Sequence, residues 1–559
     1  MIPSPRLLGP PHLERIGLIL TATGIASVAA VSFAMDPRSP IVVAVGFLLA
    51  LALIALAAGR QSVRPLYLVA FAAFAVAYAG LGLARDGAGA ALVLYVVFAG
   101  LAVAVTTRAY RPLTVGTFAL WTPAVRFFGP YPFDTSFPLP VAAAAVLSLA
   151  TTVVLLVLRD AVTPVERVRR VALALLSLAC VAAVVDRHAS VASPGILAPD
   201  DLLAIAASVL LPVLAVLRLR GAMRDAIAIG LALAIYAAAG AALVIGQGYQ
   251  VDTIVAQHRA TELFLQGADP YRVTDVIASL RDRGLDPALG THLEDGSQLH
   301  AYTYPALSFL IPAPFLALGL TDLRLVYLGE ILLLIVVLLR PVGAVWRPLA
   351  AAVLVGSTVI MRQNIAAGVD PAYALFLALA FVAIRQRTLS PICIGLAVAC
   401  RQPAWIFVPF YVLQIWRRDG RTEALRRTAI LAAAAALPNL PFLLGAPGAF
   451  LGGVTAPMLQ PLEPYGVGLV SFGLAGILPL WPRAAYGLLS ALVLGGLLLL
   501  LVRCRRALPQ ALVVFPSLVL WFSWRSAENY FGFAGIFALI GDETMQADAE
   551  PAAPGLNGA

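Results

Sequence analysis

The chain has 559 residues, of which 61% are apolar and 12% are charged, and its net charge is +9. Because a soluble domain carries about 25% charged residues, this chain has too few charges to cover its surface in water. The composition excludes a soluble enzyme, a secreted disulfide scaffold, a disordered protein and a nucleic-acid binder. It predicts an all-α polytopic protein of the plasma membrane, whose first partner is the lipid bilayer.

The first half of the chain contains nine apolar runs of about 17–20 residues, each long enough to cross a bilayer as a helix. Arginines fall in every second loop between these runs, and the positive-inside rule assigns those loops to the cytoplasm. The N-terminus is therefore predicted to be cytoplasmic and residue 247 external. Residues 1–220 are predicted to form an accessory module of eight helices, and the ninth run lies near 226–246. The eight runs lie near 16–34, 41–58, 66–83, 90–107, 113–129, 139–158, 171–186 and 201–217.

Residues 247–303 are the longest polar segment and are predicted to form an external loop. They contain eight acidic residues, four arginines and three of the five histidines of the chain. Within this segment, residues 252–265 predict a helix along the membrane surface. Asp252 and Arg259 would share one face of it because they are seven residues apart. The histidines have no standard metal-ligand spacing, so no metal site is expected.

The second half completes a bundle predicted to have about 18 crossings. Two runs, 304–320 and 466–480, are predicted to dip into the outer leaflet as re-entrant segments, which keeps the arginine-rich loops cytoplasmic. Their prolines and glycines suit short, broken helices. The tail 542–559 is predicted to be disordered and cytoplasmic. The remaining runs lie near 323–340, 348–361, 370–384, 389–400, 403–416, 428–444, 484–502, 508–524 and 530–541.

Four groups of polar residues interrupt apolar sequence on the side of the external loop. Ionisable residues inside a membrane are costly, so such groups mark candidate functional sites. Each group also has a structural explanation: Arg525 can pair with Glu528, and Asp370 can cap a helix that begins at Pro371. Because all four fall on one side, we predict a shared site. The groups are Asp252; Arg362, Asn364 and Asp370; Arg401 and Gln402; and Arg525, Glu528 and Tyr530.

The residue types of this site suit chemistry on a lipid-linked phosphate. Arginine holds phosphate through bidentate hydrogen bonds. A carboxylate at the membrane surface can remove a proton from a hydroxyl group.

Two stretches of the sequence resemble a known family: DTIVAQHRATELFLQGADPYR (Asp252–Arg272) and YTYPALSFLIPAPF (Tyr302–Phe315). They are similar to the GT-C glycosyltransferases, above all to the polyprenyl-phosphate-mannose-dependent mannosyltransferases of prokaryotes. That family carries an external aspartate, then a Gly-x-(Asn/Asp)-(Pro/Leu)-Tyr element and a Tyr-Pro-Pro-Leu-like element. The likeness extends over residues 226–541, including Gly368–Val412 and SWRSAENYF. It departs from the family at Ala306, which replaces the second proline, and at Arg401, where the family usually has lysine.

The resemblance implies that residues 221–541 are a GT-C-like catalytic domain. It would move a sugar, mannose in that family, from a polyprenyl phosphate to a hydroxyl group of a glycan, glycolipid or protein, with inversion and without a cofactor. Asp252 matches the family's presumed base, and Arg401, Arg362 or Arg525 would stabilise the leaving phosphate. The other predicted substrate-binding residues are Arg259, Asp269, Tyr271, Tyr302, Tyr304, Asn364, Asp370, Gln402, Glu528 and Tyr530.

The alternative is a transporter or flippase of a lipid-linked or small polar substrate. Such proteins place their binding groups near the bilayer midplane, often between repeated halves. Here no internal repeat is evident, and the polar residues gather at one face. A catalytically inactive relative or a lipid-binding scaffold is a third possibility.

Overall fold

The computed structural model describes residues 221–246, 248–341, 371–466, 469–470, 479–503, 512, 515–516, 519–520, 522–527 and 530. This part of the chain is 72% helical, which confirms the all-α prediction. The predicted accessory module 1–220, the tail 542–559, the run near 348–361 and all but the first residue of the run near 530–541 lie outside it.

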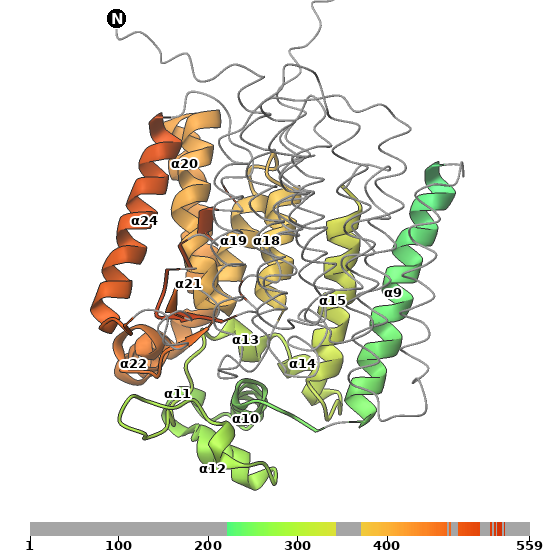
Figure 1. Cartoon of the computed structure of the whole chain (residues 1–559). Coiled ribbons are helices and arrows are strands. Elements are labelled where there is room, and N and C mark those ends of the chain that lie inside the picture. Colours follow the sequence, from blue (N-terminus) through green and yellow to red (C-terminus); the bar gives the residue numbers. More distant parts are fainter. Residues whose placement is uncertain are drawn as a thin grey trace, which may run out of the picture.

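Seven of the described helices stand side by side with their long axes roughly aligned (Figure 1). Each coincides with a predicted apolar run, to within a few residues at most ends. Helix α20 begins four residues later than predicted because a short 3₁₀ helix, η3 (Gln402–Ile406), precedes it. The seven helices are α9 (Gly221–Gly246), α15 (Arg324–Leu339), α18 (Ala372–Val382), α19 (Leu389–Cys400), α20 (Phe407–Asp419), α21 (Arg421–Gly445) and α24 (Arg483–Arg503).

A cap made by residues 248–300 covers one end of this bundle, at the bottom of Figure 1. Its main helix α10 (Asp252–Leu265) has the bounds that the sequence predicts, and it is seen nearly end-on, across the bundle axis. Asp252 in its first turn complements the positive end of the helix dipole. The cap also contains α11 (Pro270–Val273), α12 (Val276–Asp282) and the 3₁₀ helix η1 (Pro287–Leu289).

Short elements fill the junction between the cap and the bundle. The predicted broken run 304–320 is indeed divided into α13 (Leu307–Leu310) and α14 (Ala313–Ala317), with Pro312 between them. Helix α22 (Pro447–Leu459) was not predicted and packs beside α11. Two-residue strands β1 (Tyr465–Gly466) and β2 (Arg525–Ser526) pair in parallel, with Tyr465 opposite Arg525. Most of the second predicted re-entrant run, 466–480, lies outside the described residues.

Among the described residues, α21 is long and apolar enough to cross a membrane, while α18 and α19 are shorter apolar helices. Only 11% of the apolar window of α21 is buried within the protein, and leucines such as Leu437 and Leu444 point outward. The predicted total of about 18 crossings stays a prediction.

Helices α19 and α21 pack closely against each other at Gly395. A Cβ atom at this position would lie 2.5 Å from the backbone oxygen of Leu431 and 2.7 Å from Cβ of Ala434. Backbone atoms cannot swing aside as a flexible side chain can, so any larger residue would push the two helices apart.

We predict that Gly395→Ala lowers the thermal midpoint of the purified protein. Overpacking costs about 1–3 kcal/mol, which exceeds the gain of about 0.5–1 kcal/mol that alanine brings to a helix interior. Gly329→Ala on α15 is the matched control, because a Cβ there meets no atom within 4 Å. Its midpoint should stay level or rise. Equal behaviour of the two variants would contradict the close packing.

Candidate functional site

Asp252 lies at the start of α10, beside the segment 290–300 of the same cap. Its Oδ2 atom accepts two hydrogen bonds from Thr291, one from the backbone N–H at 2.9 Å and one from the hydroxyl at 2.7 Å. Its Oδ1 atom is 3.4 Å from the hydroxyl of Thr253. The predicted base is therefore half-buried. It is held by Thr291, which lies 39 residues further along the chain and outside the family-like stretch Asp252–Arg272.

Tyr304 connects this carboxylate to Arg401. The Thr253 hydroxyl lies 3.0 Å from the hydroxyl of Tyr304, and the Cζ atom of Arg401 lies 4.4 Å from the centroid of the Tyr304 ring. Asp252 and Arg401 both act electrostatically on Tyr304. Three predicted residues from distant segments thus converge: a carboxylate, a phenol and a guanidinium.

Arg401 is 4% exposed and lies between two helices. Its extended backbone (φ −152°, ψ 145°) ends α19 and begins η3. The next residue, Gln402, precedes Pro403 and donates hydrogen bonds to the backbone oxygens of Thr303 (2.6 Å) and Val454 (3.0 Å). Gln402 therefore holds the Tyr304 segment and α22 together, so its hydrogen bonds in this structure are structural.

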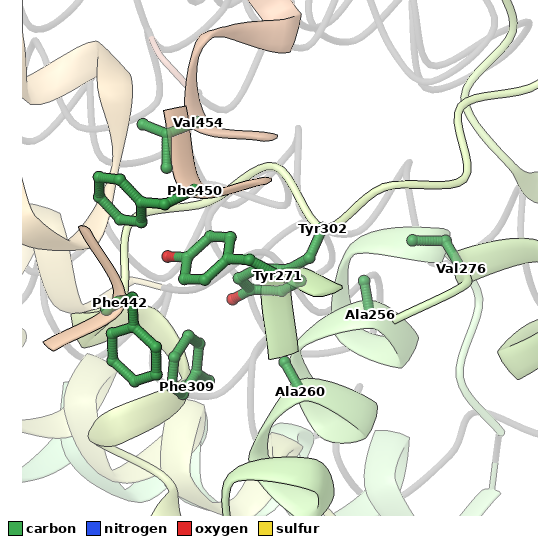
Figure 2. Packing of buried hydrophobic residues seen from close by; sticks show 10 residues of the cluster. Ala256, Ala260, Tyr271, Val276, Tyr302, Phe309, Phe442, Phe450 and Val454 are labelled. Atoms are coloured by element: carbon green, nitrogen blue, oxygen red, sulfur yellow. The ribbon is translucent and has the colours of Figure 1, made fainter. Parts of the chain in front are cut away.

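Tyr271 and Tyr302 belong to an aromatic cluster (Figure 2), against which Tyr304 packs. They are 6% and 1% exposed, and protein atoms surround their rings. The Tyr271 ring lies 4.9 Å from that of Phe450 in an edge-on arrangement, and its hydroxyl donates to the backbone oxygen of Tyr304. Both tyrosines are predicted to bind substrate. In this structure their rings pack in the core, and the Tyr271 hydroxyl holds the backbone of Tyr304.

Two more predicted residues in the cap have local partners. The Asp269 carboxylate accepts a hydrogen bond from the backbone N–H of Tyr271 and so caps α11. Arg259 directs its guanidinium to Glu262, 3.3 Å away on the same helix. Helix capping and an i, i+3 ion pair explain these two side chains without a ligand.

Of the predicted site residues near the C-terminus, the structure describes Arg525 and Tyr530. Arg525 lies in β2, with its Cζ atom 5.6 Å from the centroid of the Tyr465 ring. Tyr530 is near enough to Tyr304 for their phenol groups to interact when ionised, so it lies close to the site. The partner proposed for Arg525, Glu528, lies outside the described residues, as do Arg362, Asn364 and Asp370.

A second polar network, which the sequence analysis missed, runs along the other face of α10. His258 is 5% exposed, and its Nδ1 atom lies 2.8 Å from the hydroxyl of Tyr249. Its Nε2 atom is 3.5 Å from Glu262, which also accepts from Arg283 at 2.8 Å. His258, Glu262 and Arg283 line an open pocket of about 470 Å³. Its apolar lining residues are Leu265, Leu316 and Leu320.

No group of three or more histidine, cysteine, aspartate or glutamate side chains in the described part of the chain could hold a metal ion. Comparison with known proteins finds no match to this chain, whether among family models, curated proteins or solved structures.

Burial and, to a smaller extent, the nearby Arg283 guanidinium together lower the pKa of His258 from 6.5 to about 4, against the opposing charges of Glu262 and Asp322. The unfolded chain therefore binds a proton at this residue at higher pH than the folded protein does. The contribution of neutral His258 to the free energy of unfolding is therefore fully present above pH 6.5. It is lost as the pH falls toward 4, because the unfolded chain then takes up a proton more readily.

We predict that His258→Gln reduces the loss of thermal stability between pH 6.5 and pH 4, because glutamine can still accept the Tyr249 hydrogen bond and does not take up a proton. The thermal midpoint measured across this window checks the expectation. His300→Gln is the control, since the His300 side chain is 59% exposed. A wild-type pH profile for His258→Gln would show that the buried imidazole is not responsible.

Proposed function

We propose that the chain is an integral membrane glycosyltransferase that transfers a sugar, mannose by its family resemblance, from a polyprenyl phosphate to a hydroxyl acceptor. The observation that carries the proposal is the convergence of Asp252, Tyr304 and Arg401 at the capped end of the bundle. These residues come from three of the four segments that carry the resemblance to the GT-C family. The exposed leucines of α21 support a lipid-facing bundle.

Each group has a role in this reaction. Asp252 removes the proton from the acceptor hydroxyl as its oxygen attacks the anomeric carbon of the sugar. The bond between that carbon and the phosphate oxygen breaks, and the configuration inverts. Arg401 stabilises the negative charge left on the polyprenyl phosphate, an interaction that is strong because the guanidinium is shielded from water.

The position of the groups favours an enzyme over a transporter. Asp252 begins a cap helix and Arg401 follows the last residue of α19, so both lie where helices end. Transporters usually bind their substrate near the middle of the bundle, within discontinuous helices. A site beside a polar cap suits an acceptor that arrives from water and a donor that arrives from the membrane.

We predict that Asp252→Asn lowers sugar transfer by a factor of about 10²–10⁴, the usual contribution of a general base. Membranes that contain the variant would be supplied with radiolabelled polyprenyl-phosphate mannose, and label in their endogenous acceptors would be measured. Glu294→Gln is the control, because it removes an exposed carboxylate from the same cap. Undiminished transfer by Asp252→Asn would refute its role, and uptake of labelled lipid without a glycosylated product would favour a flippase.

We predict that Arg401→Lys retains much more transfer than Arg401→Gln. Lysine keeps the positive charge and is the residue that the family usually has there, whereas glutamine removes the charge that faces the leaving phosphate. Loss of such stabilisation costs a factor of about 10²–10³ in kcat. The same transfer assay applies, with folding monitored by size-exclusion chromatography. Equal rates for the two variants would mean that the charge of Arg401 is not used.

A further inference from the structure

We propose that Thr291 is a positioning residue, which occupies Oδ2 of Asp252 and so leaves Oδ1 as the atom that accepts the proton. The inference rests on the proposed function, because it takes Asp252 as the base. It adds a residue that lies outside every motif of the resemblance and assigns the two carboxylate oxygens different tasks.

The hydrogen bonds around Asp252 are unequal. Thr291 donates twice to Oδ2, from its backbone N–H and from its hydroxyl, at 2.9 and 2.7 Å. A carboxylate oxygen has about two lone-pair sites, so these donors fill Oδ2. At Oδ1 the contact from Thr253 is long, 3.4 Å, and the same Thr253 hydroxyl lies 3.0 Å from Tyr304. Oδ1 therefore lies on the side that leads to Tyr304 and Arg401.

The backbone around Thr291 is held firmly enough to act as a fixed support. Leu299 N–H donates to the Thr291 backbone oxygen at 2.8 Å, and the next residue, His292, forms a bridge with Gln298. On the preceding side, Gly290 packs against α12, where a Cβ atom would lie 2.3 Å from Cδ1 of Ile277. Neither side leaves the threonine room to move.

The same segment is joined to the C-terminal part of the chain. Leu293 forms an antiparallel bridge with Leu462, and Glu463 N–H donates to the His292 backbone oxygen at 3.0 Å. The indole of Trp524 donates to the Leu462 backbone oxygen at 2.7 Å, directly before strand β2. These contacts connect the segment that holds Asp252 to the segment that carries Arg525.

A carboxylate with a fixed orientation is a more effective base, for a geometric reason. Asp252 is half-buried at a helix end, where a free carboxylate would rotate about its last torsion angle, which has a broad minimum. Two charge-assisted hydrogen bonds to one oxygen restrict this rotation and keep the other oxygen in a single direction. Catalysis depends on such orientation, and small misplacements reduce kcat strongly.

The test compares Thr291→Val with Thr291→Ser in the transfer assay with labelled polyprenyl-phosphate mannose. Valine keeps the shape and the backbone N–H but removes the hydroxyl donor, so kcat should fall about 10- to 100-fold, the effect of one hydrogen bond to a charged group. The KM for the donor should stay within about twofold, because the interaction does not bind donor. Serine restores the donor and should keep kcat within about threefold of wild type.

Ser297→Ala is the matched control, since its hydroxyl stabilises the same loop by donating to Asp295 and does not touch Asp252. Wild-type kcat in Thr291→Val, or an equal loss of kcat in Ser297→Ala, would overturn the inference. If Asp252→Asn is inactive in the same experiment, the proposed function survives that result. Full activity of Asp252→Asn, or absence of transfer by the wild-type protein, would overturn the proposed function and the inference with it.

Discussion

The cost of burying charge governs how the capped end of this molecule is built. A guanidinium or carboxylate away from water is tolerated only where hydrogen bonds, opposite charge or an aromatic face compensate for the lost hydration. Charged residues make up only 12% of this chain, and each one that is buried needs such compensating contacts. Arg401 has its environment at the end of α19, over the ring of Tyr304. The segment that carries this ring is in turn held by Gln402 and by Tyr271.

The opposite end of the same helices meets the same demand in a different way. Arg427 on α21 is 1% exposed and lies 3.2 Å from Asp419 and 2.8 Å from Glu423. It also donates to the backbone oxygen of Ile384 at 2.7 Å. Two carboxylates and a carbonyl group surround this guanidinium, so its charge is neutralised within the protein. That arrangement suits an ion-pair network that holds neighbouring helices together. At the capped end, the guanidinium instead stacks on an aromatic ring beside the proposed base, an arrangement suited to chemistry.

The packing of the aromatic cluster fixes the position of the cap relative to the bundle. Tyr271, Tyr302, Phe309, Phe442 and Phe450 come from the cap, α13, α21, α22 and the segments between them (Figure 2). Their edge-on contacts, at 4.9–6.0 Å between ring centroids, join the cap rigidly to the bundle. Cap and bundle must be joined in this way for a carboxylate on one and a guanidinium on the other to act on a single substrate.

Local patterns in the sequence determined the helices. Apolar runs predicted seven bundle helices, and α10 has the predicted bounds because its buried face recurs with helical spacing. The structure brings Asp252, Tyr304 and Arg401 together. The prediction that the four polar groups form one functional site stays a prediction. Only the tertiary structure decided that Thr291 holds Asp252, that Tyr302 is buried, and that α22 forms. These features depend on contacts between segments far apart in sequence, and no local periodicity encodes which distant backbone a side chain will meet.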